Sequence, residues 1–175
     1  QERVEAALAQ VARELEELEA RVLSEARGIG ATLFRLAIME PLYQRSFDTV
    51  IVDEASMVPL TNLWFAAMLA SKRVVITGDF RQLPPIAAAS DPEDYPKAAR
   101  WLRRDVFEEA GVVGADGRVN LQDQRLASLR KQYRMHSKIG DLVNALVYAR
   151  DGHPLEHEAD EGELERIIDA VPEPG

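Results

Sequence analysis

The chain has 175 residues, of which 46% are hydrophobic, and a formal net charge of −9. This length and apolar content are sufficient for one core of ordinary size. The absence of cysteine excludes disulfides and thiolate metal sites. No apolar run approaches membrane-spanning length and no signal peptide is visible, so we expect a cytoplasmic protein with no membrane partner.

The charged residues are unevenly distributed along the chain. Residues 28–150 contain 14 acids and 16 bases, whereas the residues after 150 contain nine acids and one base. The middle part therefore permits binding to nucleic acid, although the net charge of the whole chain does not favour it. We expect residues 156–175 to be an acidic, flexible tail, so His153, Glu156 and His157 are interpreted as solvated side chains rather than metal ligands.

Apolar residues recur at alternating spacings of four and three near the start of the chain: Val4, Leu8, Val11, Leu15, Leu18 and Val22. This heptad pattern predicts a long helix that Gly28 ends. We expect residues 1–27 to be the stalk helix of a coiled coil, with a partner helix for residues 4–22. Packing on the protein's own core and a homodimeric coiled coil are the alternatives. A short strand over Gly28–Thr32 and a helix or loop over Leu33–Arg45 should follow.

A β-branched run, Thr49–Val52, ends in two adjacent carboxylates. Such a run predicts a strand buried on both faces of a parallel sheet. Asp53 and Glu54 follow at its carboxyl end, where doubly wound folds bind ligands. We assign Asp53 to Mg²⁺ or its water and Glu54 to activation of the attacking water. A solvated Asp-Glu pair is the alternative.

A second apolar run leads to a loop with an uncharged amide. Leu63–Ala70 predicts a short helix that crosses back to a strand over Arg73–Thr77. Gly78 allows a sharp turn, after which Asp79 and Gln82 lie at the carboxyl end of that strand. An uncharged amide can bond a γ-phosphate or the attacking water without repelling it, so we assign Gln82 as a phosphate sensor. An ordinary Gly-Asp turn followed by prolines is the alternative.

The next part of the chain is predicted to be a loop, a helix and a turn-rich connection. We expect a loop over residues 87–96 and a helix over Pro96–Ala110 that Gly111 ends. Trp101 stands among three arginines and is interpreted as a core residue rather than a nucleic-acid contact. The crossing into a second domain is expected within residues 111–130.

An aromatic residue and an arginine follow the last predicted strand. Leu126–Gln132 can form this strand, and Tyr133 and Arg134 come directly after it. The arginine can stabilise charge that develops during phosphoryl transfer, and the tyrosine can stack on a base. A partly buried tyrosine beside a salt-bridged arginine is the alternative. Ser137 can cap a helix spanning 138–149.

Three segments in this order strongly resemble superfamily 1 helicases. They are VIVDEAS at 50–56, VITGDFRQLPP at 75–85 and KQYRMH at 131–136. The branch that they resemble most is that of the nonsense-mediated-decay helicase and its bacterial relatives. RGIGATLFR at 27–35 is similar to that branch's nucleic-acid-contacting strand and Ala-Thr turn. The resemblance covers about residues 27–155.

The resemblance implies an α/β fold of the RecA-like type, with a doubly wound, mostly parallel sheet that follows the long heptad helix. Residues 28–120 would then be part of a first RecA-like motor domain, and residues 121–155 the start of a second. Asp53 and Glu54 would be the Walker B pair, and ATP and Mg²⁺ the cofactors.

The remaining roles come from the same resemblance. Asp79 and Gln82 would bind the nucleotide, with Gln82 at the γ-phosphate. Tyr133 would stack near the adenine and Arg134 would act as an arginine finger. Thr32 would contact the nucleic-acid backbone. The partner would be single-stranded nucleic acid, and neither DNA nor RNA is singled out.

Three departures qualify the resemblance. Phe80 and Arg81 replace the usual His-Lys, and Ser137 stands where proline is common, all outside the residues assigned to chemistry. More importantly, no GxxxxGK followed by Ser or Thr occurs, so the chain has no phosphate-cradling loop. We therefore expect an internal piece of a larger ATP-dependent helicase, inactive without the remainder. A non-enzymatic scaffold or interaction piece is the alternative.

Overall fold

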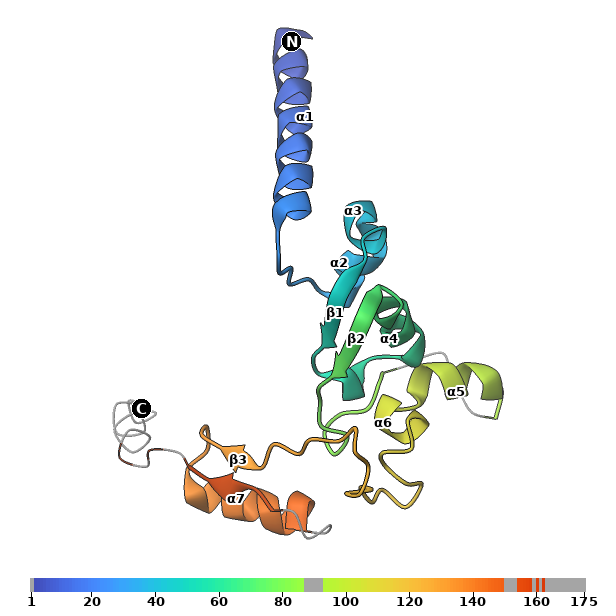
Figure 1. Ribbon diagram of the computed structural model, residues 1–175, viewed down its shortest axis with the longest axis vertical. Helices are drawn as coiled ribbons and strands as arrows, with labels where there is room; N and C mark the ends of the chain where they lie inside the picture. The colour runs from blue at the N-terminus through green and yellow to red at the C-terminus, as the bar shows by residue number, and fades with distance from the viewer. Residues whose placement is uncertain (1, 87–92, 150–153, 159, 161, 163–175) are drawn as a thin grey trace, which may run out of the picture. The chain divides into compact units, whose positions relative to one another are not determined.

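The computed structural model describes residues 2–86, 93–149, 154–158, 160 and 162. The chain divides into two compact units (Figure 1). Unit 1 comprises Gln1–Asp79 and Leu83–Asp105, and unit 2 comprises Phe80–Gln82 and Val106–Gly175. No helix among the described residues is long and apolar enough to cross a membrane. The motor-domain boundaries expected from the sequence stay a prediction.

Unit 1 begins with α1, the helix Glu2–Glu25. All six side chains of the predicted seam are exposed, from 45% at Leu18 to 64% at Leu8. The C-terminal end of α1 is held by Arg45, whose guanidinium donates to the carbonyl oxygen of Leu23 and, at 2.8 Å, to that of Ala26. A cation at this end also suits the helix dipole. The pairing of the seam in a coiled coil stays a prediction.

The prediction of a strand over Gly28–Thr32 is wrong, because this segment is an irregular connection. Thr32 instead caps α2 (Leu33–Ile38), and its Oγ1 accepts the N–H of Arg35 at 3.1 Å. Threonine next to a helix start satisfies a backbone donor that the helix leaves unpaired, and this local bond competes with a strand. The short helix α3 (Glu40–Tyr43) follows and buries Leu42.

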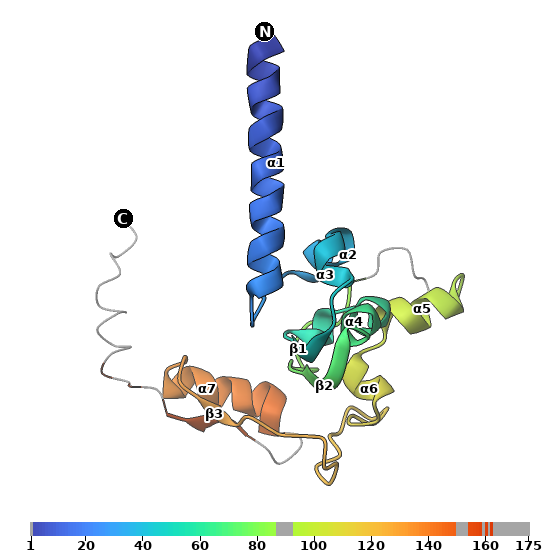
Figure 2. The ribbon, with the colours of Figure 1, turned by 45° about the horizontal axis from the view of Figure 1, so that its top comes forward.

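Two parallel strands and one helix form the centre of unit 1 (Figure 2). β1 (Phe47–Val52) pairs in parallel with β2 (Ala70–Ile76), and Val52 lies opposite Ile76. The connection runs through a 3₁₀ turn, η1 (Ala55–Met57), and α4 (Leu60–Ala67). The helix starts and ends three residues earlier than expected, because it begins directly after Pro59 and Ala70 already belongs to β2. The parallel pairing is as expected, and the doubly wound sheet stays a prediction.

The expected burial of β1 on both faces is wrong. Val52 is 5% exposed, whereas Ile51 is 66% exposed. Successive side chains of a strand point to opposite faces, so one face of β1 is covered and the other is open in the described residues. The covered face belongs to a core with three side chains of α4: Leu60, Leu63 and Ala66.

The single helix expected over Pro96–Ala110 is two helices. Arg104 has an extended backbone, with φ −73° and ψ 136°, and ends α5 (Pro96–Arg103). The second helix, α6 (Val106–Glu109), follows Asp105, a residue type favoured just before a helix. Gly111, at φ 71°, ends it as predicted. Residues 87–92 of the expected loop lie outside the described residues.

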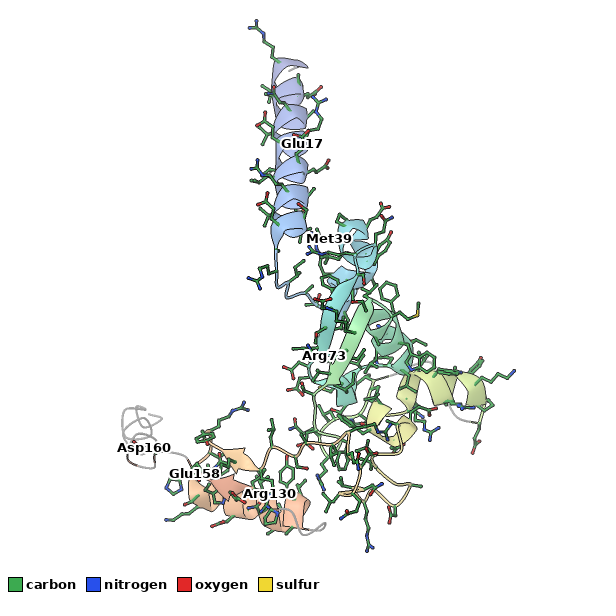
Figure 3. The ribbon with its side chains drawn as sticks, in the orientation of Figure 1. Glu17, Met39, Arg73, Arg130, Glu158 and Asp160 are labelled. Atoms are coloured by element: carbon green, nitrogen blue, oxygen red, sulfur yellow. The ribbon has the colours of Figure 1, made fainter. Side chains whose placement is uncertain are left out.

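Unit 2 contains a two-residue parallel pairing beside a helix. The expected strand Leu126–Gln132 is reduced to β3 (Lys131–Gln132), which pairs with β4 (Glu156–His157). Side chains reinforce the pairing: Arg130 contacts Glu156 at 2.9 Å and Lys131 contacts Glu158 at 2.8 Å. Arg130 and Glu158 are labelled in Figure 3.

The helix expected over 138–149 is α7 (Ser137–Val143), continued by a π-helical turn, η2 (Asn144–Tyr148). Its cap is His136 rather than Ser137, because Nδ1 of His136 accepts the N–H of Lys138 at 3.2 Å.

Glu156 and His157, assigned from the sequence to an acidic tail, are therefore part of a folded unit. His157 is not a solvated side chain, since it bonds to neighbours on β3 and α7. His153 and residues 159, 161 and 163–175 lie outside the described residues. Among those described, no cluster of three potential metal-ligating side chains occurs.

Candidate functional site

Asp53 is held at the end of β1 by two hydrogen bonds to one oxygen. Its Oδ1 accepts the hydroxyl of Thr77 at 2.5 Å and the backbone N–H of Glu54 at 3.0 Å. The hydrogen bond from Thr77 makes the largest contribution to lowering the pKa of Asp53 below its ordinary value, and the bond from the Glu54 N–H makes the second largest. Asp53 is therefore an anion near neutral pH with one oxygen fixed, and its Oδ2 makes no hydrogen bond to the described residues.

Glu54 has a left-handed backbone, with φ 52° and ψ 38°. Among the described residues it is the one non-glycine residue with a positive φ. This conformation costs a non-glycine residue roughly 1–2 kcal/mol, and such strain clusters at functional sites. Glu54 is exposed at the start of η1, whereas the next two residues, Ala55 and Ser56, are buried.

Thr77 is a site residue that the sequence analysis missed. It follows Ile76 as Asp53 follows Val52, and these two strand residues are register partners. Ala55 and Thr77 are also joined by a backbone bond of 2.9 Å. Aligning the carboxyl ends of the two predicted strands would have placed a hydroxyl beside the carboxylate.

The loop after β2 is divided between the two units. Asp79 belongs to unit 1, and Phe80–Gln82 belong to unit 2. Asp53, Glu54 and Asp79 are thus positioned by unit 1.

Gln82, Tyr133 and Arg134 line one open pocket of about 870 Å³ in unit 2. Each of these three residues was singled out from the sequence. The remaining wall residues come from the loop after β2, from β3 and the turn after it, and from α7 and η2: Arg81, Lys131, Gln132, Met135, Val143, Val147 and Tyr148. The structure therefore brings together three predicted site residues that are distant in sequence.

Arg81 belongs to this wall, although the sequence analysis placed it outside the chemistry. Its guanidinium carbon lies 4.4 Å from the ring centroid of Phe80 and 5.5 Å from that of Tyr148. Both distances are within the range of a cation–π contact. Of the two residues at the usual His-Lys positions, Arg81 thus lines the pocket, and Phe80 packs against Phe107 with ring centroids 6.2 Å apart.

The turn that carries Tyr133 and Arg134 is shaped by Gln132, a second residue that the sequence analysis missed. Gln132 Oε1 accepts the backbone N–H groups of Arg134 at 3.0 Å and Met135 at 2.7 Å, and its Nε2 donates to the carbonyl oxygen of Met135 at 2.8 Å. One amide thus satisfies three backbone groups of the turn. An amide directly before an aromatic-arginine pair is the signal that was available in the sequence.

His157 supports this amide from β4. Its Nδ1 lies 3.0 Å from Nε2 of Gln132, and its Nε2 lies 3.1 Å from Oδ1 of Asp141. The bonds are consistent with a neutral ring that carries its proton on Nε2, because the amide nitrogen can only donate to Nδ1.

Thr32 lies in unit 1 at the start of α2. Its hydroxyl oxygen is occupied as an acceptor by the Arg35 N–H, and the residue is exposed. The hydroxyl retains its donor capacity toward a phosphate. Its assigned contact with nucleic acid stays a prediction.

Comparison with known proteins agrees with the resemblance. The family described as AAA domain matches residues 1–90. DNA replication ATP-dependent helicase/nuclease DNA2 is 34% identical over 114 residues in Gallus gallus, covering 65% of this chain and 10% of that protein. The Homo sapiens protein of the same name is 31% identical over 114 residues, covering 65% of this chain and 9% of that protein.

DNA-binding protein SMUBP-2 of Mesocricetus auratus is 29% identical over 107 residues, covering 61% of this chain and 10% of that protein. The chain thus spans about 10% of the length of the curated relatives it matches. The chain belongs to the AAA domain family and, with it, to the superfamily 1 helicases.

Proposed function

We propose that the chain is the central part of an ATP-dependent helicase or translocase acting on single-stranded nucleic acid. It supplies the Walker B carboxylates, a γ-phosphate sensor and an arginine finger. The segment that cradles the phosphates comes from outside these 175 residues. The observation that carries the proposal is the unit 2 pocket lined by Gln82, Tyr133 and Arg134.

Asp53 has the features of a Mg²⁺ partner. Mg²⁺ in nucleotide sites is usually held by one or two carboxylates, waters and the phosphates themselves. The lowered pKa of Asp53 keeps it ionised, and the Thr77 bond occupies its Oδ1, so we assign Oδ2 to the ion or its water. When bound, the ion would neutralise charge on the phosphates. Asp79 contributes as a nucleotide-binding residue of the loop after β2.

The other residues have separate roles in the proposal. Glu54 takes the proton of the attacking water, and its left-handed backbone sets the direction in which its side chain leaves the chain. The amide of Gln82 contacts the γ-phosphate. Tyr133, which is 67% exposed, stacks on the base, and Arg134 stabilises charge on the transferred phosphoryl group.

The test compares variants of the complete protein that contains this chain. Glu54→Gln keeps the shape of the side chain and removes the base, so ATP should bind but not be hydrolysed. Arg134→Ala should lower nucleic-acid-stimulated turnover by roughly 10³-fold or more. The matched control is Arg118→Ala, which removes an exposed arginine of the same unit that lies 3.8 Å from Asp116 and does not line the pocket, and turnover should then stay within a few-fold.

Near-normal turnover in both Glu54→Gln and Arg134→Ala would reject these roles and favour the scaffold alternative. The chain by itself should show no ATP hydrolysis. Hydrolysis by the isolated chain that Glu54→Gln abolishes would show that no outside segment is required.

A further inference from the structure

The two tryptophans of the chain lie against each other at the surface of unit 1. The rings of Trp64 on α4 and Trp101 on α5 have centroids 5.9 Å apart and planes at 85°. Trp64 is 53% exposed and Trp101 is 38% exposed. The preceding residue of α4, Leu63, is 4% exposed, so the helix buries its other face and presents Trp64 outward. The core role expected for Trp101 is therefore wrong.

The helix that carries Trp101 is rich in basic residues. α5 contains Lys97, Arg100 and Arg103 and no acidic residue, and Arg104 follows directly. The guanidinium carbon of Arg100 lies 5.5 Å from the centroid of the Trp101 ring. The acids of the same stretch lie outside the helix: Glu93, Asp94 and Asp105, the last of which is buried.

We propose that this patch, Trp64 with Trp101, Arg100 and Arg103, binds one nucleotide unit of single-stranded nucleic acid. Exposed aromatic rings among cations are the combination that stacks bases and neutralises phosphates without reading sequence. Trp64 offers the stacking face because its ring is the more exposed, and Trp101 supports it edge-on. The arginines meet the phosphates on either side of the stacked base.

The exposed rings mark this patch as a binding surface, and its charge favours nucleic acid over a partner protein. Exposed rings of this size mark a binding surface, and α5 concentrates positive charge on a chain whose net charge is −9. Basic residues near the C-terminus of a helix also stabilise its dipole, but this role does not account for two exposed tryptophans. The proposal rests on the proposed function only for the class of ligand, and it concerns residues separate from the ATP chemistry.

The chain contains two tryptophans, so fluorescence reports on the patch directly. In Trp101→Phe, Trp64 is the one tryptophan, and titration with oligothymidylate at low salt should quench its fluorescence to saturation. Trp64→Ala should weaken binding roughly tenfold to a hundredfold, measured by anisotropy of a labelled oligothymidylate, whereas Trp64→Phe should restore most of the affinity.

The double variant Arg100→Gln with Arg103→Gln tests the phosphate contacts and should weaken binding. The slope of log affinity against log salt should become shallower by about 0.7 for each phosphate that an arginine no longer neutralises.

The matched control is Arg3→Gln with Arg13→Gln, which removes the same charge from exposed positions of α1 and should leave affinity within about twofold. Circular dichroism of each variant checks folding, and the arginine pair tests the proposal even if Trp64→Ala unfolds. The proposed binding patch is refuted if the chain does not bind oligothymidylate. It is also refuted if neither Trp64→Ala nor the double variant of Arg100 and Arg103 changes the affinity. Neither result bears on the ATP-dependent function, which the Glu54 and Arg134 variants test separately.

Discussion

Gln132 Nε2 lies 3.0 Å from Nδ1 of His157, a residue 25 positions later in the chain. The same amide shapes the turn that carries Arg134. The geometry of the proposed arginine finger thus depends on a histidine of β4, which in turn lies against the backbone of α7. A Cβ added at Gly140 would lie 2.1 Å from Cε1 of His157.

Gly140→Ala should destabilise unit 2. Alanine in a helix normally gains roughly 0.5–1 kcal/mol over glycine, but overpacking against a ring held by two hydrogen bonds costs typically about 1–3 kcal/mol. The net effect should be a lower midpoint in urea unfolding and an altered NMR signal of the Arg134 N–H. Gly28→Ala, where a Cβ meets nothing within 4 Å, is the control and should not lower stability. A stabilised Gly140→Ala would contradict the contact with His157.

Thr77→Val should raise the pKa of Asp53 toward its ordinary value. The hydroxyl of Thr77 makes the larger of the two contributions that lower this pKa, and valine keeps the shape without the donor. Carboxyl NMR signals followed during an acid titration report the value directly. Thr77→Ser retains the donor and should keep the pKa low. An unchanged titration in Thr77→Val would mean that the backbone bond from Glu54 suffices.

Unit 2 should lose stability in acid through Asp123. Hydrogen bonds from the side chain and the backbone of Arg125 lower the pKa of Asp123 from 3.8 to about 2. Because the folded pKa lies below the unfolded one, the stabilisation is complete above about pH 4 and is lost as the pH falls toward about 2. Urea unfolding should therefore separate wild type from Asp123→Asn at about pH 5, with the difference disappearing near about pH 2.

Asp116→Asn is a matched comparison for this effect. Asp116 also accepts a backbone N–H two residues later, at 3.1 Å from Arg118, but its ion-pair distance to that arginine is 3.8 Å. Its substitution should have the smaller effect at the higher pH. Equal effects of the two substitutions would assign the Asp123 contribution to the turn rather than to the ion pair.

The exposed seam of α1 should pair with another helix. A run of exposed Val and Leu at heptad spacing usually marks an interface. Replacing Leu8, Leu15 and Leu18 by Glu should abolish any association measured by sedimentation and leave the rest of the chain folded. Unfolding of unit 1 by this triple variant would show that the helix packs on its own domain.

The control adds the same charge away from the seam. Ala6, Ala9 and Ala20 are on the same helix but not in the seam, and their replacement by Glu should leave association unchanged. Loss of association in this control would attribute the effect to net charge.

Sequence patterns predicted the local elements best where one rule acted alone. The β-branched run before Asp53 predicted β1, and Gly111 predicted the end of α6, because side-chain branching and a positive φ act within a few residues. The strand predicted over Gly28–Thr32 does not form, because the helix cap made by Thr32 competes with the extended pattern. The predicted burial of Trp101 was wrong, because burial depends on which elements pack against a helix, and the helix's own sequence does not specify them.

By itself the sequence determined the family and which residues carry its motifs: Asp53, Glu54, Gln82, Tyr133 and Arg134. Only the tertiary structure decided their neighbours. The register of β1 and β2 brings Thr77 to Asp53, and the pairing of β3 with β4 brings His157 to Gln132. The reason is physical: a motif is a local property of the chain, whereas a hydrogen bond between distant strands requires that those strands pair in one register and no other.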